Sequence, residues 1–218
     1  MKIQTYDKNQ ITNPPNDIVI YDKNFVFQQP VTLFLEQFLE EPKTSSHDFI
    51  ITDTNQVEYF KCSKVTKNKM VIYDINNVAL LNLQIKSFPL EINVFGGDDD
   101  KNLIGSYIPK ASTTAEKCEF QFVNQATQQT ETVHMNCDQY YCSGGIFYGR
   151  EKDGAPMICK FREVMDANSF MTYCNKKYVI EIAARVDNTL FIALAIYFAE
   201  MNLHTRKNRL NYSDFTRH

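Results

Sequence analysis

The positions of apolar and polar residues divide the chain into many short alternating segments and one wholly apolar segment near its end. In four segments apolar side chains occupy every second position, with mostly polar ones between them: residues 81–86, 118–122, 157–162 and 178–185. This period of two is typical of antiparallel strands that bury one face and expose the other. Further strands are expected at residues 91–95, 103–108, 130–137 and 145–150, and at residues 31–39, where a short helix is the alternative. The pattern therefore predicts a mainly antiparallel β protein.

The wholly apolar segment, residues 190–199, carries neither a charge nor a polar face. A helix that is apolar all round has to be buried all round. The segment is also too short to span a membrane, which needs about 20 apolar residues. Asp187 lies just before it, and an aspartate there can accept the free backbone N–H groups of a first helical turn. We therefore predict a buried helix that begins after Asp187 and is surrounded by the strands.

A repeat occurs in the first half of the chain, and it superimposes Asp53 on Asp74 and Asn55 on Asn76. Each copy predicts a strand, an Asp-x-Asn turn and a second strand. In such a turn the Asp side chain caps the backbone, and the Asn is expected to adopt the left-handed conformation that closes a tight hairpin. We interpret both aspartates as turn residues rather than as catalytic groups.

Hairpins and one wholly apolar helix can be combined in few ways. A third hairpin is expected over residues 147–161, with its turn at Asp153-Gly154. Each strand has one apolar face, whereas the helix needs apolar neighbours on every side. A closed or nearly closed antiparallel sheet with the helix through its middle meets both needs, and closure leaves no exposed edge strand.

In this order the segments resemble the LURP-one-related proteins, whose domain belongs with the tubby C-terminal domain and the phospholipid scramblases. The resemblance covers roughly residues 30–202 and rests on residues 49–53, 70–74, 80–83, 149–154, 157–160, 178–182, 186–187 and the apolar segment after them. It implies a tubby C-terminal-like fold, a closed antiparallel barrel of about twelve strands around a buried C-terminal hydrophobic helix. The resemblance also implies that the protein has no enzymatic activity. Tubby-like domains bind phosphoinositide headgroups through basic residues, so the resemblance makes such binding an expectation.

Three parts are expected in the 218-residue chain: an N-terminal arm over residues 1–16, the tubby-like domain over 17–203 and a basic C-terminal tail over 204–218. The net charge of −3 offers no overall attraction to nucleic acid or to an anionic membrane, so any such binding needs a local patch. The N-terminus is too polar for a signal peptide. We expect a cytoplasmic protein, with peripheral attachment to membranes as an option, and no nucleic-acid partner.

The sequence carries no recognisable motif for catalysis or metal binding. The chain contains no P-loop, dinucleotide fingerprint or Gly-x-Ser-x-Gly elbow. The spacing of His134, Cys137 and Cys142 fits no zinc template, and the aspartates at 98–100 lack the alternation of a calcium loop. Cys142 precedes a Ser-Gly-Gly turn, yet the sequence indicates no base that could activate it. We expect reduced cysteines, no metal, no cofactor and no enzymatic activity.

The third hairpin carries the candidate site for a lipid headgroup. Lys160 and Arg162 are two residues apart and are expected on its outer face, while Arg150 and Lys152 belong to the preceding strand and its turn. Clusters of this kind favour phosphate oxygens, although Glu151 and Glu163 dilute the charge, and an ordinary solvated sheet face is the alternative. The sequence thus favours a non-catalytic module that binds phosphoinositide or anionic lipid. The alternative is a protein-interaction or regulatory scaffold with an unidentified protein partner and no lipid ligand.

Overall fold

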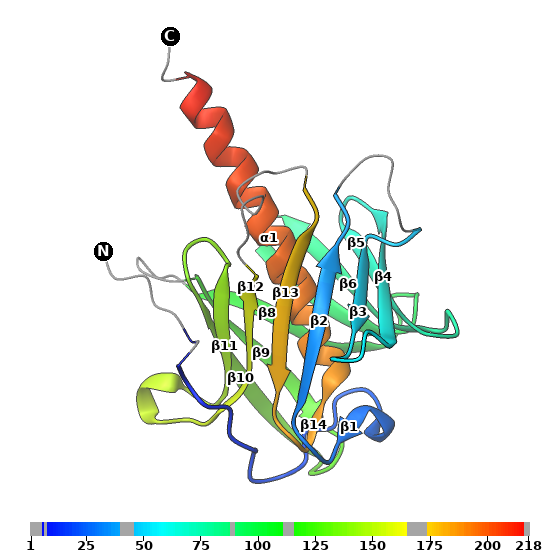
Figure 1. Ribbon diagram of the computed structural model, residues 1–218. Coiled ribbons are helices and arrows are strands. Elements are labelled where there is room, and N and C mark those ends of the chain that lie inside the picture. The colour runs from blue at the N-terminus through cyan, green and yellow to red at the C-terminus, as the bar shows by residue number, and fades with distance from the viewer. Residues whose placement is uncertain are drawn as a thin grey trace.

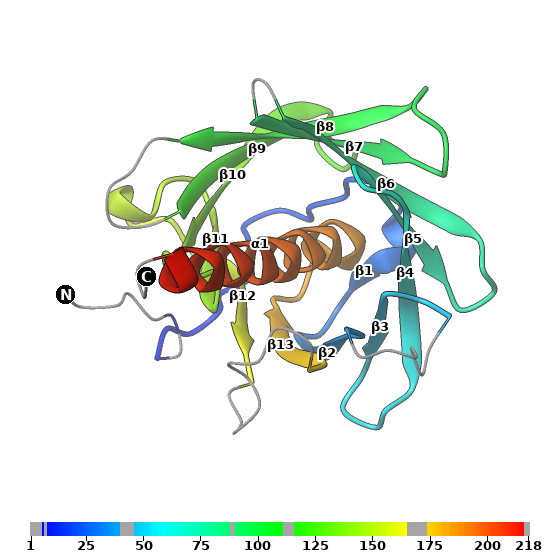
Figure 2. The same cartoon turned by 90° about the horizontal axis from the view of Figure 1, so that it is seen from above.

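Twelve strands form a closed antiparallel barrel in the computed structural model of the protein, and a single long helix passes through it (Figures 1 and 2). The structure describes residues 6, 8–39, 46–87, 90–110, 116–164 and 174–215, and of residues 87, 90 and 207–215 the backbone alone. The barrel strands are β2 Val31–Gln37, β3 Phe49–Thr52, β4 Glu58–Thr66, β5 Lys69–Asp74, β6 Ala79–Ser87, β7 Leu90–Gly96, β8 Leu103–Lys110, β9 Glu116–Asn124, β10 Gln129–Cys137, β11 Ser143–Tyr148, β12 Met157–Glu163 and β13 Lys176–Ile182.

The barrel is a simple meander in which each strand pairs with its neighbours in the sequence. The ring closes where β13 pairs with β2, with Ile180 opposite Leu33. Their side chains point inward and are fully buried, as alternation along the strands predicts. The predicted closed antiparallel barrel with a helix in its lumen is therefore confirmed.

The central helix α1 Asn188–Phe215 follows the short strand β14 Val186–Asp187. Every residue from 190 to 199 is at most 5% exposed, because the inward faces of the strands surround this half of the helix. The helix begins directly after Asp187, whose Oδ1 accepts a hydrogen bond from the backbone N–H of Thr189 at 3.0 Å. This confirms the predicted cap. The backbone remains helical through residues 204–215, most of the segment assigned from sequence to a basic tail, and this end projects beyond the barrel (Figure 1).

Where the helix leaves the barrel, its polar residues are paired with the strands. Lys64 of β4 contacts Glu200 at 2.7 Å, and Arg206 contacts Glu163 of β12 at 2.5 Å. Glu163 was expected to dilute an outer basic surface, and this expectation was wrong. Its carboxylate points inward like Phe161 and is fully buried. Sequence alternation alone places Glu163 on the inner face. The charge is tolerable there because Arg206 of α1 pairs with it and Lys176 of β13 adds a second nearby positive charge.

The two repeated hairpins use their aspartates as predicted. Asp53 Oδ1 accepts from two backbone N–H groups of its own turn at 2.8 and 2.9 Å, and Asp74 does the same at 2.9 and 2.8 Å. The left-handed residues are Gln56 and Asn77, one position later than expected. The carboxylate holds the next residues in a right-handed turn, so the left-handed residue comes last and forms a bulge, as in three-residue hairpin loops.

The segment before the barrel crosses its closed end and its outer face. The 3-10 turn η1 Lys23–Phe25 leads into β1 Val26–Phe27, which pairs with β14 to form a separate two-stranded sheet. Before it, the described part of residues 6–16 contacts β12 and, through Asn13, Ala184. Among the helices described, none has a stretch long and apolar enough to cross a bilayer.

Candidate anion-binding cleft

A cleft of about 520 Å³ lies on the outer face of β8, β9 and β10, beside the 3-10 turn η2 Glu151–Asp153. We call it the basic cleft and define it by the residues that line it: Lys110, Lys117, Cys118, Glu119, His134, Asn136, Arg150, Glu151 and Lys152. Its volume is within the range of small-molecule sites, about 300–1,000 Å³. It is therefore large enough to accept a phosphorylated headgroup.

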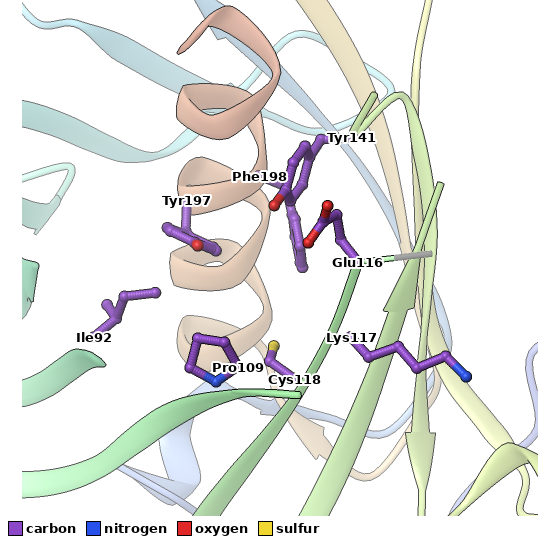
Figure 3. Close-up of a pocket in the computed structure, with 8 residues that line it drawn as sticks. All are labelled: Ile92, Pro109, Glu116, Lys117, Cys118, Tyr141, Tyr197 and Phe198. Carbon is purple, nitrogen blue, oxygen red and sulfur yellow. The ribbon is translucent and has the colours of Figure 1, made fainter. Parts of the chain in front are cut away.

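Strand register places residues from three strands beside one another in this cleft. Lys117 of β9 is paired with Lys110 of β8 on one side and with Asn136 of β10 on the other. Successive residues of a strand point to opposite faces, so Lys117 points outward while Cys118 points toward the helix. Figure 3 shows this directly: the Lys117 side chain extends away from α1 and that of Cys118 faces it. The floor of the cleft is thus set by the pairing of β8, β9 and β10.

The turn between β11 and β12 supplies the remaining wall. Gly149 has a φ of 106°, a left-handed conformation that only glycine adopts readily, and it forms an isolated bridge with Val133 of β10. This turn in the chain brings Arg150 and the η2 residues over β10, where Arg150 and Lys152 join the lysines from β8 and β9. Gly154, with a φ of 81°, ends η2 at the predicted turn.

The basic cleft has an excess of positive charge. Its walls carry four Lys and Arg side chains against two carboxylates. One carboxylate, Glu119, is paired with Lys110 at 2.9 Å and with the ring of His134 at 3.5 Å. Within the described part of the chain, Lys117, Arg150 and Lys152 make no ion pair. These three cations are therefore available to an anionic ligand.

The second carboxylate of the cleft belongs to Glu151, and its partners include two neutral groups. Its Oε2 accepts hydrogen bonds from the Asn136 amide and, at 3.4 Å, from the Tyr6 hydroxyl of the N-terminal segment. Burial raises the pKa of Tyr6, and the nearby Glu151 raises it further, so the phenol stays protonated and acts as a donor. These hydrogen bonds hold the Glu151 carboxylate at the edge of the cleft.

The four residues selected from the sequence do not form one cluster. Arg150 and Lys152 line the basic cleft, whereas Lys160 contacts Glu181 of β13 at 3.2 Å and donates to the backbone oxygen of Asn9 at 3.2 Å. Arg162 is exposed farther along β12, opposite Val179. Neither Lys160 nor Arg162 lines the cleft.

Sequence reasoning missed Lys110 and Lys117. Both lie just outside the strands expected at residues 103–108 and 118–122, and their exposed positions agree with period-two alternation in β8 and β9. The local sequence around Lys110 and Lys117 does not indicate that η2 lies beside them. That proximity depends on contacts between segments that are distant in the sequence, such as the bridge between Val133 and Gly149. A register assignment for β8, β9 and β10 would have been the only usable signal.

A smaller cavity of about 40 Å³ lies on the inner side of the same strands, between them and α1 (Figure 3). Glu116 points into this region toward Tyr141 and Phe198, and the Glu116 carboxylate hydrogen bonds with the Tyr141 hydroxyl. A space of this size holds one or two water molecules and excludes an organic ligand.

The arrangement around Cys142 does not favour nucleophilic catalysis. Burial raises the pKa of its thiol to about 11, whereas a reactive cysteine needs a lowered pKa. The two glycines after Ser143 have packing roles. A Cβ on Gly144 would lie 2.4 Å from the Phe161 ring, and a Cβ on Gly145 would lie 3.1 Å from the ring of Tyr6. In the described ranges, no group of three or more His, Cys, Asp or Glu residues is arranged to hold a metal ion.

These features define a class of protein, a closed twelve-stranded barrel filled by its own C-terminal helix. A family model described as LURP-one-related matches residues 31–199, so the chain belongs to the LURP-one-related family. The fold is similar to that of an Arabidopsis thaliana protein solved by X-ray crystallography, with a TM-score of 0.56, 14% sequence identity, and coverage of 84% of this chain and 98% of that one. No curated protein matches the sequence.

Proposed function

We propose that this protein is a non-catalytic module that binds anionic phospholipid headgroups, phosphoinositides in particular, in the basic cleft. The observation that carries the proposal is the presence in one cleft of headgroup size of three cations, Lys117, Arg150 and Lys152, that make no ion pair with any described residue. Arg can engage phosphate oxygens in a bidentate manner, and Lys adds a point charge. The absence of an activated nucleophile at Cys142 supports binding rather than turnover.

The expected affinity is modest. Each basic residue near an anionic surface contributes about 1 kcal/mol. Lys117, Arg150 and Lys152 together therefore supply about 3 kcal/mol, which corresponds to a dissociation constant of about 6 mM for one isolated headgroup. Binding should therefore depend on ionic strength and on several lipid contacts at once. A cleft preorganised by strand register strengthens binding, because its side chains lose less freedom when the ligand arrives.

Flotation with phosphatidylcholine vesicles that contain phosphatidylinositol bisphosphate tests the proposal, at low and at physiological salt. The native protein should float, and a variant with Lys117→Ser, Arg150→Ser and Lys152→Ser should remain with the soluble fraction. A control with Lys23→Ser, Lys67→Ser and Lys177→Ser removes the same charge from exposed sites outside the cleft and should float like the native protein. Equal loss in the two variants would mean that net charge, not the cleft, drives binding.

A further variant, Lys160→Ser with Arg162→Ser, separates the cleft from the outer face of β12. We expect this variant to float normally, since Lys160 is already paired with Glu181. If it alone abolished flotation, the headgroup site would lie on the third hairpin strand, and the basic cleft would be excluded.

A protein-interaction scaffold is the second candidate function, favoured by two neighbouring hairpin tips. Val57 in one tip, and Ile75 and Val78 in the other, are 55–56% exposed. The β3–β4 and β5–β6 turns lie at the same end of the barrel, because β4 and β5 are adjacent and antiparallel. Exposed apolar side chains at one end are a feature of protein contact sites. Native protein that does not float, but loses a co-purifying partner on Val57→Ser and Val78→Ser, would favour this function.

A further inference from the structure

We propose that the described part of the N-terminal segment, Tyr6 and residues 8–16, acts as a strap that holds the basic cleft in its binding conformation. Tyr6 is the positioning residue. The inference rests on the proposed function of the cleft and adds how that function is controlled. It starts from a small apolar cluster on the outside of the barrel, which is separate from the main core and consists of Tyr6, Phe147 and Met157 with Ile11 and Ala155 against it.

Tyr6 packs across the base of the hairpin that carries η2. Phe147 near the end of β11 and Met157 at the start of β12 are opposite each other in the register, and the chain between them forms the η2 turn. The Tyr6 ring, only 2% exposed, contacts Phe147 edge-on at 5.9 Å between ring centroids. The ring therefore bridges the two stems from which Arg150 and Lys152 extend.

The Tyr6 ring fits against β11 because residue 145 is a glycine and has no side chain. A Cβ on Gly145 would lie 3.1 Å from the Tyr6 ring and 2.9 Å from the Met157 sulfur, so a residue larger than glycine would crowd both partners. The same segment is attached at two further points: the Thr12 N–H donates to the oxygen of Met157 at 2.8 Å, and Lys160 donates to the oxygen of Asn9 at 3.2 Å. The segment thus crosses the hairpin base with several contacts.

The end of the Tyr6 side chain reaches the cleft itself. Its hydroxyl donates to Glu151 Oε2 at 3.4 Å, and the Asn136 amide donates to the same oxygen. Glu151 lies between Arg150 and Lys152, the two η2-side cations of the cleft. The docked strap therefore restrains the β11–β12 hairpin at two points. The Tyr6 ring contacts the base of the hairpin, and the Tyr6 hydroxyl contacts Glu151 in the η2 turn at its tip.

The expected consequence follows from coupled equilibria. If release of the strap leaves η2 in the binding conformation about one tenth of the time, the apparent dissociation constant for the anion rises about tenfold. Linkage is reciprocal, so a bound anion should stabilise the docked strap by the same factor. Both effects can be measured on the 218-residue chain.

The test compares the native protein with Tyr6→Ala and Tyr6→Phe. Binding is measured with vesicles of phosphatidylcholine and phosphatidylinositol bisphosphate, and strap docking is measured by hydrogen exchange of the Thr12 amide. We expect Tyr6→Ala to bind about tenfold more weakly and to exchange Thr12 faster. Tyr6→Phe keeps the ring in its site, so Thr12 should stay protected while binding falls by a smaller factor. Vesicles should slow Thr12 exchange in the native protein.

A control variant, Asp17→Ala, breaks the 2.7 Å contact with Arg185 beyond the other end of the strap and should leave binding unchanged. Native protein that binds vesicles while Tyr6→Ala binds equally well would overturn the strap and leave the proposed function standing. Native protein that does not bind would remove the proposed function and the strap together. Faster Thr12 exchange in Tyr6→Ala with unaltered affinity would also overturn the coupling, because the strap would then be released without any effect on vesicle binding.

Discussion

Asp187 accepts a hydrogen bond from the backbone N–H of Tyr21 at 2.8 Å, which ties the segment before the barrel to the start of the helix inside it. The same carboxylate oxygen accepts from Ile20 and Asp22, and the other oxygen accepts from the Thr189 backbone and hydroxyl. Burial raises the pKa of Asp187, while these donors favour the ionised form. One fully buried carboxylate therefore fixes three segments, the N-terminal crossing, β14 and α1.

Asp187→Ala should lower the free energy of unfolding by about 2–4 kcal/mol, because it leaves several buried N–H groups without acceptors. Urea denaturation provides the measurement. Asp53→Ala is a matched control, since Asp53 accepts from two backbone N–H groups in an exposed turn, and its loss should cost about 1 kcal/mol. Equal costs for the two variants would contradict the role of Asp187 as a junction.

Ile196→Asp should prevent folding. Ile196 is fully buried in the barrel lumen, and an unpaired carboxylate there costs several kcal/mol, a large fraction of the stability of a domain. Ala195→Asp should act in the same way. The control is Val123→Asp on β9, where the native side chain is 55% exposed, and this variant should stay soluble with little change in melting. Soluble, normally melting Ile196→Asp protein would show that the helix does not fill the barrel.

Arg206→Met should destabilise the protein by about 3–5 kcal/mol, because it removes the ion-pair partner of the buried Glu163. Burial already raises the pKa of Glu163 in the presence of Arg206. Adding Glu163→Gln to Arg206→Met should restore much of the stability, since the neutral amide is easier to bury. A double-mutant cycle from urea midpoints gives the coupling between the two residues, expected to exceed about 1 kcal/mol. Additive effects would mean that the ion pair does not anchor the helix exit.

His134 should make stability depend on pH. Burial lowers the pKa of its ring, Arg150 and Lys110 lower it further, and Glu119 and Asp153 oppose them. As pH falls below about 6.5, the ordinary pKa of histidine, the unfolded chain takes up a proton first, so the folded state loses stability. The native protein should therefore lose stability more steeply between pH 7 and 5 than His134→Gln, measured by urea midpoints. Parallel pH curves would contradict the lowered pKa.

Much of the fold can be predicted from local sequence, because alternation and turn chemistry act over a few residues. Period two in β6, β9, β12 and β13 identifies strands, and the uniform apolarity of residues 190–199 identifies a helix that needs a complete apolar envelope. Asp53 and Asp74 identify their turns by capping them. Even here a local competition decided a detail: the Asp cap moves the left-handed residue from Asn55 to Gln56.

The candidate site is different, because its parts come from distant segments. Local sequence patterns are enough to predict that strands surround a helix and that Arg150 and Lys152 lie at a hairpin turn. Long-range packing, by contrast, brings this turn to Lys110 and Lys117, pairs Lys160 with Glu181, and gives the inward-facing Glu163 its partner Arg206. The physical reason is that backbone preferences are local, whereas the charge of a cleft depends on strand register and on which cations already have partners, and both are fixed only when the barrel closes.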